Sequence, residues 1–148
     1  MKRMLGVLML VLVSMATGPS ADAQRSPAEI AQIKKKAAAG DAFAQYNLGV
    51  MYDDGERVPQ NKTEAVKWYR LAAAQGLAFA QYNLGVMYAK GTGVPEDYVQ
   101  AYKWWNLAAA AGDSDAVKNK NIVAEKMTKE QIAEAQRLST AFKPTKTP

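Results

Sequence analysis

The chain contains no cysteine and no histidine among its 148 residues. Without cysteine there is no disulfide, no thiolate nucleophile and no lipid-modified N-terminal cysteine. Without histidine the common acid–base side chain near neutral pH is missing, and with it the Ser-His-Asp and Cys-His sites of many hydrolases. Most structural zinc sites use the same two residue types. Only carboxylate, lysine, tyrosine or serine chemistry remains, and we predict a protein with no metal site, no cofactor and no enzymatic activity.

Long apolar runs are also scarce. The longest, Met4 to Val13, follows the basic start Met1-Lys2-Arg3 and precedes the small-residue signal Ala21-Asp22-Ala23. A membrane span needs about 20 apolar residues, so this pattern is typical of a secretory signal peptide over residues 1–23, cut after Ala23. The expected location is periplasmic or secreted, with no stable membrane insertion after cleavage. The alternative is an uncleaved anchor that holds the same domain at the membrane.

The net charge is modestly basic. It is +5 for the whole chain and +4 after loss of Lys2, Arg3 and Asp22. The basic residues are scattered and few aromatic residues lie among them, which argues against a nucleic-acid partner. Acidic envelope polymers are a more plausible electrostatic partner. The run Lys34 to Lys36 fits a solvated helix face better than a binding site for an acidic partner or membrane.

The dominant feature of the chain is an internal repeat of 36 residues. Residues 43–52 recur unchanged as residues 79–88, and residues 40–75 match residues 76–111 at 22 of 36 positions without a gap. Short units of this kind contact only their neighbours and stack into an array with a continuous surface. We therefore assign repeat 1 to residues 40–75 and repeat 2 to residues 76–111.

Each unit is predicted to be a pair of helices. In repeat 1 the first helix should run from about Ala42 to Tyr52, and the second should follow a capping box at Asn61 to Glu64, matched by Asp97 to Gln100 in repeat 2. Glycine costs a helix interior about 1 kcal/mol against alanine. Its presence at Gly49 therefore suggests that the backbone of the second helix approaches there too closely for a Cβ.

The flanks are predicted to cap the array. Residues 24–39 form an N-terminal capping helix that starts at Ser26-Pro27. Residues 112–143 form degenerate C-terminal capping helices, because Lys118 to Asn121 replace the Tyr-Asn-Leu-Gly segment of the repeats. A terminal unit must keep one face polar to stay soluble. Residues 144–148 are expected to be a disordered tail, with fraying from Lys143 onward.

The units resemble Sel1-like repeats, which are relatives of tetratricopeptide repeats. The residues that carry the resemblance are Ala44 to Tyr52, Gly55, Val58-Pro59, Ala65, Trp68-Tyr69, Ala72 to Gly76 and their partners 36 positions on. The resemblance implies an all-α, right-handed α-solenoid of antiparallel helix pairs with half-repeat caps. It also implies an adaptor or scaffold that binds protein or peptide partners, often in the bacterial envelope or at host contacts.

Two departures from the family pattern bear on this expectation. Arg57 stands where repeat 2 has Gly93 and the family usually has glycine, so a different turn is expected in the first connector. The lack of cysteine separates the chain from the cysteine-rich secreted branch, for which penicillin-binding and β-lactamase-like activity is described. An envelope enzyme or peptidoglycan-binding protein is the alternative function. A module that regulates a membrane-bound partner is a third.

The predicted binding surface is the face of the first helices that points away from the second helices. Its residues are Phe43, Tyr46, Asn47, Val50, Phe79, Tyr82, Asn83, Val86 and Lys90. In similar tetratricopeptide arrays such a face lines the concave groove, where asparagine amides can hold a peptide main chain. We predict asparagine clamps between tyrosine walls. The alternative is that the tyrosines pack between repeats and the asparagines fix local geometry.

Two other groups of residues have simpler interpretations. Trp68 and Trp104 recur at helical spacing beside small residues, which favours core packing over sugar stacking, while Trp105 is undecided. The adjacent acids Asp53 and Asp54 could bind a cation or serve as catalytic carboxylates. Because they come just past a predicted helix end, we expect them to be solvated.

Overall fold

The computed structural model describes residues 26–145, and the regular structure within them is entirely helical. The helices are α1 (Pro27–Ala38), α2 (Ala42–Asp54), α3 (Lys62–Ala74), α4 (Ala78–Lys90), α5 (Tyr98–Ala110), α6 (Ser114–Ala124) and α7 (Lys129–Ala141). The predicted signal peptide lies outside the described residues. None of these seven helices is both long and apolar enough to span a membrane.

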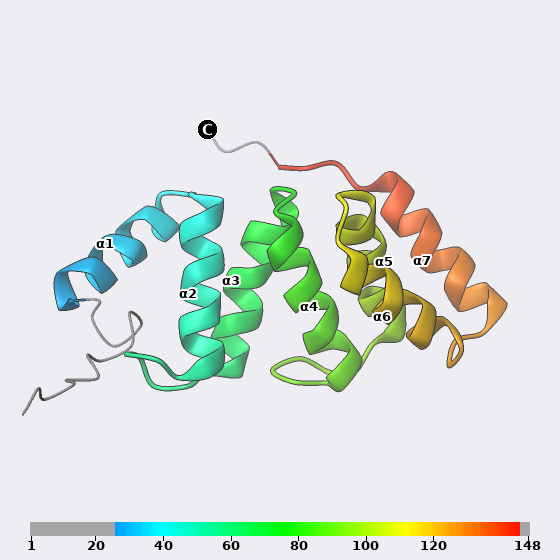
Figure 1. Cartoon of the computed structure of the whole chain (residues 1–148), viewed down its shortest axis with the longest axis horizontal. Helices are drawn as coiled ribbons and strands as arrows, with labels where there is room; N and C mark the ends of the chain where they lie inside the picture. The colour runs from blue at the N-terminus through cyan, green and yellow to red at the C-terminus, as the bar shows by residue number, and fades with distance from the viewer. Residues whose placement is uncertain (1–25, 146–148) are drawn as a thin grey trace, which may run out of the picture.

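The helices stand side by side along the long axis of the molecule, from α1 at one end to α7 at the other (Figure 1). The helices α2 and α3 form one pair and α4 and α5 form the next, and α3 packs on α4 between the pairs. The predicted all-α array of stacked helix pairs is confirmed. Its right-handed superhelical sense stays a prediction.

Most helices begin at a residue whose side chain caps the first turn, although Leu77 at the start of α4 makes no such bond. Asn61 and Asp97 accept a hydrogen bond from the backbone N–H three residues on, at the starts of α3 and α5. At α3 and α5 the capping box thus has the bond to the side chain of the first residue, and no return bond from the side chain three residues on is seen. The helices α1 and α7 have both bonds of the box. Gly55 and Gly91 end α2 and α4 with φ values of 72° and 63°, a region that costs glycine little.

A glycine and an aromatic ring join the two helices of each pair. A Cβ added to Gly49 would lie 2.6 Å from ring atoms of Tyr69, and one added to Gly85 would lie 2.5 Å from the indole nitrogen of Trp105. The glycines therefore make room for the second helix, as predicted. The prediction that its backbone fills this space was wrong, because a flat ring occupies it.

The third unit, formed by α6 and α7, lacks this glycine–aromatic contact, and its two helices do not pack on each other as a pair. Its equivalent positions hold Asn121 and Ala141, so neither the gap nor the ring is present. The helices α6 and α7 both pack on α5 rather than against each other. Residues of α7 bond to α5: the Gln136 amide donates to the Tyr102 hydroxyl at 3.3 Å.

Buried glutamines fasten successive units. Gln45 donates to the carbonyl of Ala37 and Gln81 to that of Ala73, both at 3.2 Å. Each bond ties the start of one first helix to the last turn of the preceding second helix, and each glutamine side chain is almost fully buried. A buried amide without such a partner would cost free energy, so these bonds fix the offset between units.

Two expectations about the connectors and the tail need correction. Arg57 has φ 62° and Gly93 has φ 69°, so the first connector adopts the same left-handed turn despite the missing glycine. After α7 the chain runs back over the array (Figure 1), where the Thr145 N–H donates to the Ala74 carbonyl at 2.8 Å. The start of the predicted disordered tail is thus held against the α3–α4 turn.

Candidate binding groove

The predicted surface is partly open and partly used for packing between repeats. The side chains of Phe43 and Phe79 are 61% and 59% exposed. Tyr46 lies between Tyr69 and Phe79, with ring centroids 6.0 Å from each. Its ring therefore serves the packing of repeat 1 on repeat 2, which is the alternative that the sequence left open for these tyrosines.

A polar network joins α2 to α3 in repeat 1, next to the boundary with repeat 2. The Lys62 ammonium lies 2.5 Å from the Asp53 carboxylate, which also accepts a hydrogen bond from the Tyr69 hydroxyl at 3.3 Å. Burial, helped by the nearby Asp53 charge, raises the pKa of Tyr69 far above its usual value, while a side-chain hydrogen bond from Asn83 acts in the opposite direction. The Asn83 amide therefore lies close to the Tyr69 hydroxyl.

The network corrects the expectation that Asp53 is merely solvated. It is an internal partner of Lys62 and Tyr69, half-buried at the end of α2, whereas Asp54 is exposed. The expected core packing of the tryptophans is confirmed. Trp104 is buried, Trp68 is half-buried against core residues such as Leu48, and the undecided Trp105 is buried with its indole N–H donating to the Tyr82 carbonyl at 3.1 Å.

The next boundary, between repeat 2 and the third unit, contains a groove. One cavity of about 340 Å³ is lined by Tyr82, Val86, Ala89, Lys90, Trp105 and Asn119. A second, of about 110 Å³, is lined by Ala89, Tyr98, Trp105, Asn119, Ile122, Val123 and Lys126. The two cavities share three lining residues and are therefore neighbouring lobes of one depression, which we call the α4–α6 groove. Tyr82, Val86 and Lys90 were predicted site residues.

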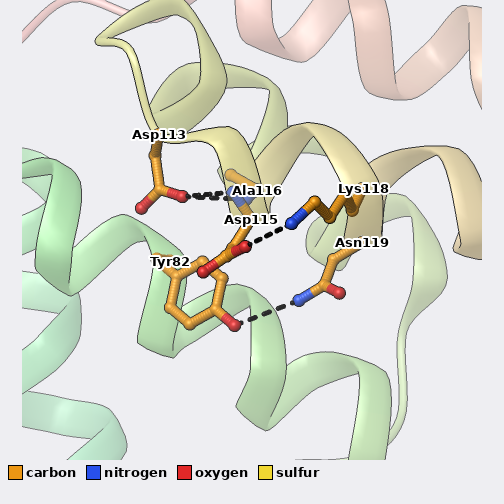
Figure 2. A network of polar contacts seen from close by, with 6 residues as sticks. All are labelled: Tyr82, Asp113, Asp115, Ala116, Lys118 and Asn119. Atoms are coloured by element: carbon orange, nitrogen blue, oxygen red, sulfur yellow. Dashed lines mark hydrogen bonds and ion pairs between the residues drawn. The ribbon is translucent and has the colours of Figure 1, made fainter.

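Asn119 stands at the centre of this groove, because it lines both lobes. Figure 2 shows the Tyr82 ring of α4 directed towards α6, where the Asn119 amide donates to the Tyr82 hydroxyl at 3.2 Å. At the start of α6, Asp113 caps the helix by accepting from Ala116 N–H, and Lys118 pairs with Asp115 (Figure 2). Sequence reasoning missed Asn119, although it lies 36 residues after Asn83.

The described residues that line the groove are apolar, aromatic, amide or basic. Lys90 and Lys126 are among them, and no Asp or Glu is. The Lys126 ammonium lies 5.9 Å from the centre of the Tyr98 ring, close enough for a cation–π contact. Within the described residues no cluster of carboxylates suited to a metal ion is found. The groove is thus suited to hold an apolar segment that carries negative charge.

The stacked helix pairs identify the chain as an α-helical repeat protein, and a groove lies at one of its unit boundaries. The Sel1 repeat family model matches residues 42–77 and 78–113, which include the helix pairs α2–α3 and α4–α5. The chain is therefore a Sel1 repeat protein, and the resemblance stated from its sequence is confirmed.

Two solved structures are similar to the chain. A protective antigen present in uropathogenic Escherichia coli strains, which displays a Sel1-like repeat fold, is 37% identical over 77% of the chain with a TM-score of 0.74. A Sel1 repeat protein from Oxalobacter formigenes is 41% identical over 61% of the chain with a TM-score of 0.60. The chain spans about a quarter of each of these proteins, 25% and 26%. No curated protein matched significantly.

Proposed function

We propose that this protein is an exported adaptor that binds a segment of a partner protein in the α4–α6 groove. The observation that carries the proposal is the groove itself, in which three predicted site residues meet Trp105 and Asn119. Aromatic and apolar walls supply contact area, and a few amide and ammonium groups fix the orientation of a bound peptide. Export rests on the sequence of residues 1–23 alone.

The similar protein from uropathogenic Escherichia coli supports an envelope or host-contact setting, because that protein is a protective antigen. The groove also lies between helix pairs, where repeat arrays form their continuous binding surfaces. The repeat 1 part of the predicted binding surface remains in the proposal, because Phe43, Asn47 and Val50 are at least partly accessible. A peptide longer than the groove would continue over them.

The test uses the chain from residue 24 onward, which contains every described residue. Peptides are selected from a displayed random library, and their affinities are measured by calorimetry. Val86→Glu places a charge in the apolar wall and should weaken binding at least about tenfold, a loss of about 1.4 kcal/mol. The matched control is Leu71→Glu, which adds the same charge on α3 at a side chain that is 43% exposed and outside the groove.

The two variants separate a specific groove from general stickiness. Leu71→Glu should bind like the wild type, and far-UV circular dichroism should show that both variants are folded. Equal binding by all three proteins would contradict the proposal. The rival envelope enzyme would be favoured by stable covalent labelling with a fluorescent penicillin, a reaction that needs a nucleophilic serine, and no serine is among the residues that line the groove.

A further inference from the structure

The two unit boundaries of the array are equivalent in sequence position but not in content. Four residues that line the smaller lobe lie 36 positions after residues of the polar network described above: Asp53, Lys62, Tyr69 and Asn83 correspond to Ala89, Tyr98, Trp105 and Asn119. The first boundary therefore serves as an internal reference for what the second one lacks.

The missing group is a carboxylate. At the first boundary the Asp53 carboxylate accepts from Lys62 and Tyr69. At the second boundary its position is taken by Ala89, which lines an open cavity. The volume of about 110 Å³ is several times the roughly 10–15 Å³ that one water molecule needs on the same measure. The lobe thus has room for a short side chain.

The two partners of Asp53 are replaced at the second boundary, but other cationic and amide groups suited to a carboxylate line this cavity. Tyr98 replaces Lys62, but Lys126 brings an ammonium to the Tyr98 ring, 5.9 Å from its centre. Asn119 replaces Asn83, and its amide carries two N–H groups, of which one bond to Tyr82 is described. The lining therefore offers a positive charge and an amide donor, and no Asp or Glu lines the lobe to compete for them.

We infer that the α4–α6 groove recognises an acidic side chain, Asp or Glu, of the partner segment, whose carboxylate enters the lobe beside Ala89. This inference rests on the proposed function and adds the chemistry that the groove selects. Charge complementarity supports it, because the lining of both lobes carries Lys90 and Lys126 and no acid. The partner would supply from outside what Asp53 supplies from within at the first boundary.

The test compares two small probes that differ in charge but hardly in shape. N-acetyl-aspartate N-methylamide and its asparagine analogue are titrated into the chain from residue 24 onward, and NMR follows the Trp105 indole and Asn119 amide signals. A charge-assisted hydrogen bond is about twice as strong as a neutral one, so the aspartate probe should bind about tenfold more tightly. Equal binding of the two probes would overturn the inference.

Matched lysine variants assign the preference to the lobe. Lys126→Met removes the ammonium and keeps most of the length of the side chain, and should abolish the preference for the aspartate probe. Lys118→Met removes another exposed lysine, which lies on α6 and pairs with Asp115 outside the groove. This variant should keep the preference for the aspartate probe. A preference that survives Lys126→Met, or acetate that binds as tightly as the probe, would rule out a peptide acid in this lobe.

The library peptides distinguish this inference from the proposed function. Peptides that need Val86 and are enriched in Asp or Glu support both. Peptides that need Val86 without acid enrichment leave the adaptor function standing and overturn the inference. If the aspartate probe binds with the expected preference but no peptide does, the adaptor function fails, and the lobe is a site for small carboxylates.

Discussion

Replacing Gly85 by alanine tests the contact that sets the helix pairs of this protein. The Cβ of an alanine would lie 2.5 Å from the indole nitrogen, 2.7 Å from Cδ1 and 2.9 Å from Cε2 of Trp105. The ring is 5% exposed and its N–H is bonded to the Tyr82 carbonyl, so it has little freedom to move aside. The substitution should therefore push α5 away from α4.

The expected sign follows from three magnitudes. Alanine in place of glycine favours a helix interior by about 1 kcal/mol. Overpacking a dense core costs about 1–3 kcal/mol, and the loss of the indole hydrogen bond costs about 1 kcal/mol more. The net result for Gly85→Ala is a loss of about 1–3 kcal/mol of unfolding free energy, measured by urea denaturation followed by circular dichroism.

Two controls separate the clash from helix propensity. Ala133→Gly, at an exposed position within α7, should lose about 1 kcal/mol and so calibrates the propensity term. Trp105→Leu removes the ring, and Gly85→Ala should then cost nothing further in that background. The reasoning is refuted if Gly85→Ala is as stable as the wild type, or if its cost persists without Trp105.

Two further predictions concern the first boundary and the connectors. Because burial and the Asp53 charge raise the pKa of Tyr69 above its usual value near 10, the folded state holds a proton that the unfolded state loses. The free energy of unfolding should not depend on the titration of Tyr69 below pH about 10 and should fall as the pH rises beyond it. The fall should be smaller in Tyr69→Phe, as measured by denaturation at a series of pH values. An identical pH dependence in both proteins would contradict this prediction. In the connectors, Gly93 takes φ 69° and a Cβ there would meet the Lys62 backbone, whereas Arg57 already holds the same turn at φ 62°. Gly93→Arg should therefore lower the free energy of unfolding by more than about 2 kcal/mol, whereas Arg57→Gly should change it by less than about 1 kcal/mol in the same denaturation assay. Similar effects from both substitutions would show that the contact with the Lys62 backbone is unimportant.

The helices and their order could be predicted because the signals for them are local. The repeat of 36 residues placed both pairs, and cap residues such as Asn61 and Asp97 placed the starts of the second helices. The positions of Gly49 and Gly85 marked a close approach of the two helices. These features depend on residues a few positions apart, where spacing alone determines which side chains share a face.

The contents of the groove could not be predicted in the same way. The first helices of repeats 1 and 2 are nearly identical, but α6 departs from them, so their faces do not predict its contacts. Asn83 lies near Tyr69 of the preceding unit, whereas Asn119 of α6 lines an open cavity beside Ala89, which stands where repeat 1 has Asp53. An alignment of the two repeats shows that substitution, but it does not show that the side chains meet.

By itself the sequence determined an array of two helix pairs between capping helices, because repetition, caps and helical spacing are written into neighbouring residues. The tertiary structure decided which ring fills the gap at each glycine, that α6 and α7 separate over α5, and that a cavity lies beside Ala89 at the second unit boundary. Those outcomes depend on contacts between side chains on different helices, whose distances are set only when all the helices are packed together.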